Sequence, residues 1–438
     1  MFITTRLVVA AVGGAVIAAI AAIAGATAAA IAIAVADGVL LVLAVGDVAY
    51  ATSPASLRPA RALPDALTMG APAVSSVRLT NPESRVMHVW FRDAAPPSLR
   101  MTPLRQRVDL PASSSAVVET ELRPSRRGLI PLGPLTLRVD GPLGLAGRQR
   151  AIPLPTTLKV YPALPGRAEA QLRFDRARVT QSGERSSAMR GGGTEFDSLR
   201  EYHPDDEFRR INWHATARAA KPISNVFREE RNQHVLLLLD AGRMMAATVE
   251  GVPRFEWGVD AAMAVADVAA RVGDHVGLAC FAADLVAMVP PRSARTQPSR
   301  ILEALFALEP TLDAPNYARV FGSLLSRWRR RSLLVLITEL TDEQAMEPLI
   351  AALPILLRRH LVTVAAVADP AMTTAALSIP VSSEDVYLKA AAARASDARD
   401  RVATRLRAMG AVVIDRPPGA LAGALVDAYL NEKASGRL

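Results

Sequence analysis

Between residues 195 and 218 the sequence has an unusual density of side chains that can ionise or hydrogen bond. Acidic and guanidinium groups alternate there around a few aromatic residues. Bidentate pairs between arginine and a carboxylate are short and directional, so they can fix an irregular strand in place. The same groups can form a pocket or a docking surface, and both interpretations stay open. The residues concerned are Glu195, Arg200, Glu201, Tyr202, Asp206, Arg209, Asn212, Trp213 and Arg218.

The sequence offers no set of residues that is typical of an enzyme. His203 and His214 lie in this segment without the spaced His, Cys or carboxylate partners of a zinc site. The chain has no Gly-x-Ser-x-Gly nucleophile turn, no Gly-Lys-Ser/Thr phosphate loop and no His-Glu-x-x-His helix. We therefore expect a non-enzymatic protein with no cofactor.

The first fifty residues predict a membrane anchor. Between Leu7 and Gly46 the only ionisable side chain is Asp37. One helix of this length would measure about 60 Å, twice a bilayer core, so two spans fit better. They run over Leu7–Ala24 and Ala28–Val48, with a turn at Gly25-Ala26-Thr27. A signal peptide has a shorter apolar centre, and a buried soluble helix pair would show a polar stripe.

Basic residues flank the predicted hairpin on one side only. Arg6 precedes the first span, while Arg58 and Arg61 follow the second. Positive flanks stay cytoplasmic, so we expect an inner-membrane protein whose termini and soluble body are cytoplasmic. The single cysteine, Cys280, agrees with a reducing compartment. Two interpretations of Asp37 stay open. It is functional within the membrane, or it is an ordinary residue that is protonated, lies near a headgroup or faces the partner helix.

The net charge of +9 does not predict nucleic-acid binding, because the arginines are scattered. The one cluster, Arg327-Trp-Arg-Arg-Arg331, lies where a helix should end, and cations are favourable there without a ligand. Attraction to anionic headgroups is another reason for a basic body beside a membrane. The expected partner of these charges is therefore the lipid bilayer.

Element patterns divide the rest of the chain. Residues 51–73 are rich in Pro and Ala and predict a linker. Residues 74–165 hold short alternating runs such as Met87–Arg92 and Leu135–Val139, which predict a small antiparallel β-sandwich. Residues 166–233 contain the ionic segment.

Residues 234–438 alternate apolar strands with amphipathic helices. The strands include His234–Asp240, His275–Phe281 and Leu361–Val367, and Leu285–Val289 should form an antiparallel edge hairpin. Such alternation predicts a mostly parallel sheet covered on both faces, a Rossmann-like α/β domain. It lacks a Gly-x-Gly-x-x-Gly after its first strand, so dinucleotide binding has no support.

These features together resemble one known family. The run Glu195-Phe to Arg218 followed by Leu236–Met244 is similar to the domain of unknown function 58 family. Arg123-Pro-Ser-Arg-Arg-Gly128, Asp140-Gly-Pro-Leu-Gly-Leu145 and the terminal Tyr429–Lys433 resemble it too, as does the two-helix anchor. The resemblance implies a von Willebrand factor A-like α/β domain and a MoxR-type AAA+ ATPase as partner. The biochemical activity of the family is not established.

Domains of the von Willebrand factor A type often bind a divalent cation above the sheet. The resemblance assigns the first ligand to Asp240, a later one to Thr311 or Asp313, and the last to Glu339. Gly242 and the methionine at position 244 replace the two serines of that site, which leaves a degenerate site for an ion such as magnesium. The alternative is that Asp240 caps the turn after its strand.

The sequence thus predicts a membrane-tethered interaction or scaffold module that works with a MoxR-type ATPase in assembling or maturing protein complexes. The alternative is a metal-assisted hydrolase that uses Asp240, Glu339 and Asp206. A third possibility is a structural role in the cell envelope through the sandwich.

Overall fold

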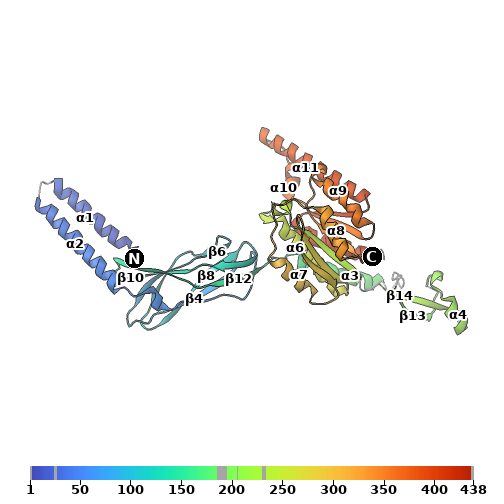
Figure 1. Ribbon diagram of the computed structural model, residues 1–438, viewed down its shortest axis with the longest axis horizontal. Coiled ribbons are helices and arrows are strands. Elements are labelled where there is room, and N and C mark those ends of the chain that lie inside the picture. Colours follow the sequence, from blue (N-terminus) through green and yellow to red (C-terminus); the bar gives the residue numbers. More distant parts are fainter. Residues whose placement is uncertain (1, 24–26, 185–194, 205, 229–232, 436–438) are drawn as a thin grey trace. The chain divides into compact units, whose positions relative to one another are not determined.

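The computed structural model describes residues 2–23, 27–184, 195–204, 206–228 and 233–435 (Figure 1). The chain divides into two compact units, Met1–Tyr161 and Pro162–Leu438. The first holds the apolar helices and a set of β-sheets, and we call its sheets the β unit. The second contains a six-stranded sheet covered by helices, and we call it the α/β unit. The mixed α/β class predicted from the sequence is confirmed.

Two apolar helices follow a short strand at the start of the chain. Strand β1 (Phe2–Ile3) leads into α1 (Thr5–Ile23), and α2 (Thr27–Tyr50) lies alongside α1 (Figure 1). Within the described residues, one helical stretch, Ala34–Leu57, is long and apolar enough to cross a membrane, and the apolar helix Thr5–Ile17 is shorter. One span is thus supported and the second stays a prediction. The predicted turn residues Gly25 and Ala26 lie outside the described residues.

The β unit consists of three sheets. A five-stranded sheet has the order β1-β11-β10-β5-β7, a four-stranded sheet the order β2-β4-β8-β6, and a three-stranded sheet the order β3-β12-β9. The strands are β2 (Ala60–Ala62), β3 (Leu67–Thr68), β4 (Ala73–Thr80), β5 (Met87–Asp93), β6 (Leu99–Thr102), β7 (Gln106–Leu110), β8 (Ser115–Pro124), β9 (Gly128–Leu132), β10 (Leu135–Asp140), β11 (Ala146–Ile152) and β12 (Thr156–Tyr161).

The five- and four-stranded sheets share one hydrophobic core. Val77 of β4 and Val118 of β8 pack in the same cluster as Val89 of β5 and Leu137 of β10. Strand side chains alternate between two faces, so every second residue of β5 and β10 points inward. The residues between them, such as Trp90, lie on the outer face of the five-stranded sheet.

Residues 51–73 do not form the predicted linker. They contain a short 3₁₀ helix (Pro54–Leu57) and strands β2 and β3, which pair with β4 and β12. Arg61, expected as a basic flank of the hairpin, has a buried side chain whose guanidinium lies 2.5 Å from the Asp93 carboxylate. Composition favoured a linker because Pro and Ala outnumber the apolar anchors Leu57 and Leu67, both of which are buried.

The last turn of α2 is bound tightly to the β unit. The buried Asp47 carboxylate accepts hydrogen bonds from the backbone N–H groups of Leu143, Leu145 and Ala146, at 2.7, 2.7 and 2.9 Å. A Cβ at Gly141 would lie 2.3 Å from Asp47, so only glycine fits in this loop. We call Asp47 and the loop from residue 141 to 146 the Asp47 clasp.

Arginine side chains complete this junction. The guanidinium of Arg148 donates to the carbonyls of Val48 and Ala49 at 3.0 and 3.2 Å, and that of Arg85 donates to the carbonyl of Tyr50 at 2.5 Å. The last carbonyls of a helix have no partner within the helix, and cations are favourable at that end. Helix α2 and the β unit therefore belong to one compact body.

The sheet of the α/β unit has the strand order β19-β18-β15-β20-β21-β22. Its inner pairs are parallel, and β19 is antiparallel to β18 at one edge, as predicted. The strands are β15 (His234–Asp240), β18 (His275–Phe281), β19 (Leu285–Arg292), β20 (Leu333–Ile337), β21 (Leu361–Val367) and β22 (Val412–Arg416), with a small hairpin of β16 (Thr248–Val249) and β17 (Val252–Pro253).

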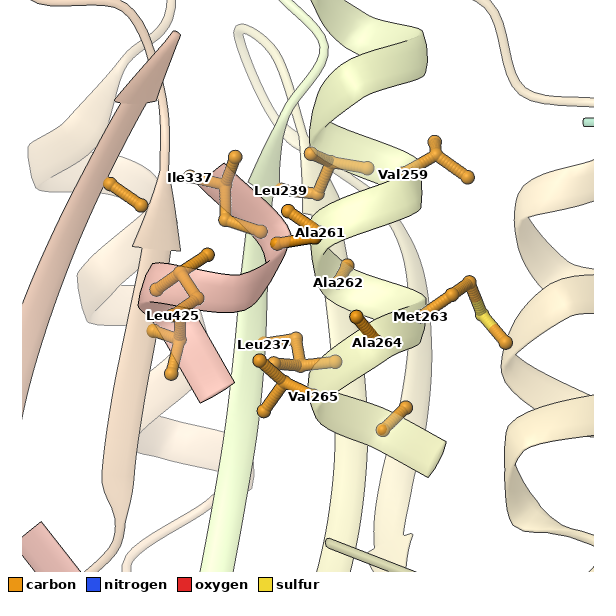
Figure 2. Close-up of a cluster of buried hydrophobic side chains, with 14 of the residues drawn as sticks. Leu237, Leu239, Val259, Ala261, Ala262, Met263, Ala264, Val265, Ile337 and Leu425 are labelled. Carbon is orange, nitrogen blue, oxygen red and sulfur yellow. The ribbon is translucent and has the colours of Figure 1, made fainter. Parts of the chain in front are cut away.

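Helices cover both faces of this sheet. Leu237 and Leu239 of β15 point into a cluster with α3, α6, α7 and α12, while Leu236 and Leu238 pack with α8, α9 and α11. Figure 2 shows Leu237 and Leu239 against α6, with Ile337 and Leu425 beside them. The helices are α3 (Gly166–Glu184), α5 (Arg243–Ala246), α6 (Arg254–Val272), α7 (Gln297–Phe306), α8 (Tyr317–Arg327), α9 (Glu343–Leu357), α10 (Pro370–Leu377), α11 (Ser383–Ala408) and α12 (Pro418–Ala434).

Helix α3 belongs to this core, although the sequence placed it with the ionic segment. Its residues Ala170 and Phe174 are buried in the same cluster as α6 and α12. The backbone N–H of Gly166, at its start, donates to the Asp260 carboxylate of α6 at 3.0 Å. A Cβ at Gly166 would lie 2.5 Å from Ala422, so this close approach requires glycine.

Asp260 should give the α/β unit a pH-dependent stability. Burial, with a smaller contribution from the charge of Glu169, raises the pKa of Asp260 to about 6, although the Gly166 N–H bond lowers it. Because the pKa of Asp260 is higher in the folded protein than its ordinary value of 3.8, the contribution of Asp260 to stability is complete below about pH 4. This contribution is lost as the pH rises through 6. Two pKa units correspond to about 3 kcal/mol.

The free energy of unfolding of Asp260→Asn, measured relative to that of the parent protein, should therefore be about 3 kcal/mol more favourable at pH 7 than at pH 4. Hydrogen exchange of α6 amides in urea at the two pH values measures this difference, because the titration of groups remote from Asp260 is the same in both proteins and cancels. A difference that is constant with pH would contradict the assignment.

Candidate functional site

The ionic segment folds into a hairpin with a helical insertion. Strand β13 (Glu195–Glu201) pairs with β14 (Ile223–Arg228), and between them lie a 3₁₀ turn (Phe208–Arg210) and α4 (Trp213–Ala219) (Figure 1). We call residues 195–228 the signature hairpin. The backbone of Glu195 pairs with that of Arg228, while the Glu195 side chain lies outside the described residues.

An ion pair fixes the turn after β13. Arg200 donates from its guanidinium to the Asp206 carboxylate, whose side chain is only 6% exposed. The same carboxylate accepts from the backbone N–H of His203 at 3.0 Å, and the Tyr202 hydroxyl donates to the Asp206 carbonyl at 3.3 Å. A carboxylate that is paired and hydrogen bonded in this way holds the backbone around it. Arg200, Tyr202 and Asp206 are therefore structural residues.

Asn212 joins α4 to the second strand. Its side-chain oxygen accepts from the backbone N–H of Ala215 at 3.0 Å, which caps the helix. Its side-chain nitrogen donates to Asn225 of β14 at 3.0 Å, and its backbone N–H donates to the Ile223 carbonyl at 2.8 Å. On the outside of the hairpin, Lys221 pairs with Glu201 at 3.1 Å between two exposed side chains. Such exposed pairs contribute little stability.

An aromatic pair is exposed on the insertion. Phe208 is 68% exposed and Trp213 is 60% exposed, and their rings meet edge to face with centroids 5.6 Å apart. Arg209 lies beside Phe208, Arg218 lies in the last turn of α4, and both are exposed. Aromatic residues and arginine are enriched at protein interfaces, and exposed large aromatics mark interaction sites. We call Phe208, Arg209, Trp213 and Arg218 the aromatic face.

The structure divides the predicted residues into two groups. Arg200, Tyr202, Asp206 and Asn212 make hydrogen bonds or ion pairs within the hairpin, whereas Arg209, Trp213 and Arg218 are exposed. Sequence reasoning missed Phe208. The short spacing between Phe208 and Trp213 across a turn could have indicated that the two rings meet.

The residues assigned to a cation lie at the carboxyl end of the sheet. Asp240 ends β15 and is buried, and its Oδ1 accepts from the backbone N–H of Gly242 at 2.7 Å. Its Oδ2 accepts from the hydroxyls of Thr338 and Tyr317, at 2.6 and 3.2 Å. Asp240 therefore caps the turn after its strand, as the alternative proposed. Burial raises the pKa of Asp240, although these hydrogen bonds lower it in part.

Glu339 is held by arginines. Its carboxylate lies 3.1 Å from the Arg254 guanidinium and 2.5 Å from that of Arg399, and its side chain is 4% exposed. Arg399, on α11, also forms a bidentate pair with Asp415 of β22. Burial alone would lower the pKa of Arg399, but the hydrogen bonds to Asp415 and the charge of Glu339 raise it. We call Arg254, Glu339, Arg399 and Asp415 the ion quartet.

Thr311 and Asp313 shape the loop beside Asp240 through their backbones. The Thr311 N–H donates to the Ala241 carbonyl at 2.7 Å, and the Asp313 carbonyl accepts from the Arg243 N–H at 2.9 Å. Both side chains are exposed.

These residues do not fit a cation. Among the described residues no group of three or more His, Cys, Asp or Glu side chains could hold a metal ion. Both oxygens of Asp240 accept hydrogen bonds, and Glu339 is paired with two cations. A divalent ion needs several free oxygen ligands at short range. The third residue of the predicted hydrolase, Asp206, is paired with Arg200 in the signature hairpin.

The C-terminal residues Tyr429 and Lys433 join a further buried cluster. The Tyr429 hydroxyl donates to the Asp274 carboxylate at 2.5 Å, and the Lys433 ammonium lies 2.7 Å from it. Asp274 is fully buried before β18, so the pair closes α12 onto the start of that strand. The sequence indicated these residues only through the resemblance, and their role is structural.

Comparison with known families identifies one match. Residues 198–389 match the family described as Protein of unknown function DUF58. The matched region begins in β13 and ends in α11, so it includes the aromatic face and Asp240. This match supports the resemblance to the domain of unknown function 58 family. No curated protein matches the chain.

Among solved structures, two short domains show weak similarity. The CARDB domain of the PF1109 protein from Pyrococcus furiosus, in complex with di-metal ions, is 13% identical over 23% of this chain and 84% of its own, with a TM-score of 0.16. SSP-19, an MSP-domain protein like family member in Caenorhabditis elegans, is 15% identical over 21% of this chain and 94% of its own, with a TM-score of 0.16. Scores this low carry no argument about fold or function.

Proposed function

We propose that this protein is a non-enzymatic interaction module, tethered to the cell membrane by α1 and α2 as a two-span hairpin. Its termini and both units would then be cytoplasmic. The observation that carries the proposal is the aromatic face, an exposed pair of large aromatics with two arginines on a hairpin that the Arg200–Asp206 ion pair holds in place. Rigid presentation of exposed aromatics favours docking of a partner.

The anchor supports the proposed location. The stretch Ala34–Leu57 is long and apolar enough to cross a membrane. Arg6 and Arg58 flank the helices and are exposed, which favours a cytoplasmic body. Arg61 does not support the orientation in the same way, because its side chain is buried against Asp93.

The proposed partner is a MoxR-type AAA+ ATPase, and the shared task is the assembly or maturation of protein complexes. This choice rests on the family resemblance. The resemblance also favours a von Willebrand factor A-type fold for the α/β unit, and the covered, mostly parallel sheet supports it. The two sheets that share a core in the β unit support the proposed β-sandwich.

Trp213→Ala should abolish recovery of the partner without unfolding the hairpin. Hot-spot aromatics contribute about 2–4 kcal/mol to binding, or a loss of affinity of roughly thirty-fold or more. The measurement is crosslinking in membranes, purification of the full chain and quantitative mass spectrometry of what is recovered. The matched control is Lys221→Ala, which removes an exposed side chain from the same hairpin.

Two outcomes would contradict the proposal. One is recovery of the same proteins at the same yield with Trp213→Ala and with the parent chain. The other is the absence of any AAA+ ATPase from the recovered proteins, which would remove the partner while leaving a docking role for another protein. Hydrogen exchange of β13 and β14 amides checks that both variants keep the hairpin.

A further inference from the structure

A cavity of about 460 Å³ lies on the outer face of the five-stranded sheet, where residues from Phe2 to Arg6 meet it. Its floor is a row of opposed residues, Arg138 of β10, Trp90 of β5 and Arg107 of β7. The volume is in the range of small-molecule sites, which are about 300–1,000 Å³.

The lining of this cavity is strongly cationic. It includes five arginines: Arg6, Arg92, Arg105, Arg107 and Arg138. The Arg138 guanidinium donates to the neutral Gln149 amide at 2.5 Å and lies 5.3 Å from the centre of the Phe2 ring. Such contacts orient an arginine without neutralising its charge.

Two carboxylates oppose these arginines. Asp109 is exposed, lies 2.5 Å from His88 and is 3.8 Å from Arg107. Asp140 lines the cavity, and burial raises the pKa of its carboxyl despite the nearby charge of Arg107. The positive charge of the arginines therefore exceeds the negative charge around them, and the cavity attracts an anion.

An apolar groove continues from this cavity. A second hollow of about 390 Å³ follows α1 and is lined by Leu7, Val8, Ala11, Val12 and Ala15. Ile3 lines both hollows, so the cationic cavity and the apolar groove are adjacent. A ligand that fills both must have an anionic head and a hydrocarbon chain.

We propose that the cavity binds the phosphate group of an anionic phospholipid, with one acyl chain along α1. Guanidinium groups match phosphate oxygens in a bidentate manner. The cavity borders the first residue of α1, which places it at headgroup level in the anchored protein, and the cytoplasmic leaflet is the one rich in anionic lipids. The inference rests on the membrane anchoring proposed above.

Native mass spectrometry of the detergent-solubilised full chain tests this binding. The probes are phosphatidylglycerol, phosphatidylcholine and glycerol 3-phosphate, which has the anionic head without the chains. We expect one tightly bound phosphatidylglycerol, with each of the other two bound at least about ten-fold more weakly.

Arg107→Gln with Arg138→Gln should weaken phosphatidylglycerol binding about ten- to hundred-fold, because two charge-assisted contacts are lost. The matched control is Arg78→Gln with Arg100→Gln, which changes the same charge at exposed positions on the four-stranded sheet. Arg92→Gln with Arg105→Gln removes a second pair of arginines from the cavity and should weaken phosphatidylglycerol binding as well. Hydrogen exchange of β10 amides shows whether each variant is folded.

Three results would overturn the inference. They are equal binding of phosphatidylcholine, equal loss in the control and cavity variants, and displacement of the lipid by glycerol 3-phosphate at matched concentration, which would indicate a site for a soluble phosphate. Extraction of membranes with alkaline carbonate tests separately whether the chain is anchored in the membrane, so a wrong lipid site can be distinguished from a wrong anchor. A chain that stays in the membrane without binding phosphatidylglycerol contradicts the lipid site alone.

Discussion

Arg399→Ala is expected to destabilise the α/β unit by about 3–5 kcal/mol, since it leaves the buried carboxylate of Glu339 without its closest cation. Glu339 has a side-chain exposure of 4% and would keep only Arg254, and Asp415 would lose its bidentate partner. Hydrogen exchange of β20 and β21 amides in urea measures the free energy of unfolding of this unit.

The same helix provides the control for this experiment. Arg401 lies two residues further along α11 and pairs with Glu343 at 3.7 Å between half-exposed side chains. Arg401→Ala should cost less than about 1 kcal/mol. If the two variants were equally stable, the ion quartet would not contribute to the stability of the sheet.

Asp47→Ala should loosen the junction between α2 and the β unit by about 3 kcal/mol. It leaves the backbone N–H groups of Leu143, Leu145 and Ala146 without an acceptor, and a buried donor without a partner costs about 1–3 kcal/mol. Faster hydrogen exchange at these three amides, with the amides of β4 unchanged, is the expected result.

Asp65→Ala is the control for this variant, because Asp65 is exposed between β2 and β3. It should leave exchange in the loop from residue 141 to 146 unchanged. Protection of that loop in Asp47→Ala equal to the parent protein would mean that Arg148 and Arg85 are sufficient to hold the helix end.

Strands buried on both faces were the easiest part of the fold to predict. The predicted bounds of β15, β18 and β21 agree with the structure, because each is a continuous apolar run between polar residues. Helix α9 was harder. Two prolines argue against a long helix here, yet the helix continues through Pro354 to Leu357 and packs Leu353 and Leu356 into the core. Burial in the tertiary structure outweighs the local cost of proline.

Polar partners far apart in the sequence could not be predicted. In the sequence Glu339 is a possible metal ligand. In the structure it pairs with Arg399 of α11, which is 60 residues away in the sequence. Asp37 interrupts an apolar run and is conspicuous in the sequence, whereas Asp47, near the end of that run, is the residue that accepts three backbone hydrogen bonds. Its donors come from a loop about a hundred residues later. Leu143 and Leu145 belong to the run Asp140-Gly-Pro-Leu-Gly-Leu145, which the sequence indicated through the resemblance, and Ala146 follows it. Single-sequence patterns describe local preference and burial, and such long-range pairs depend on topology.

The Asp47 clasp has a mechanical consequence. Many membrane tethers end in a flexible linker that allows the attached body to swivel and absorbs force. Here the chain passes from α2 into the buried Leu57 within a few residues, and the helix end is fastened by hydrogen bonds to β11 and the loop before it. The end of α2 therefore has no free segment about which the β unit could turn independently of the helix. If α2 spans a membrane as proposed, tilting the β unit would tilt the helix in the bilayer with it.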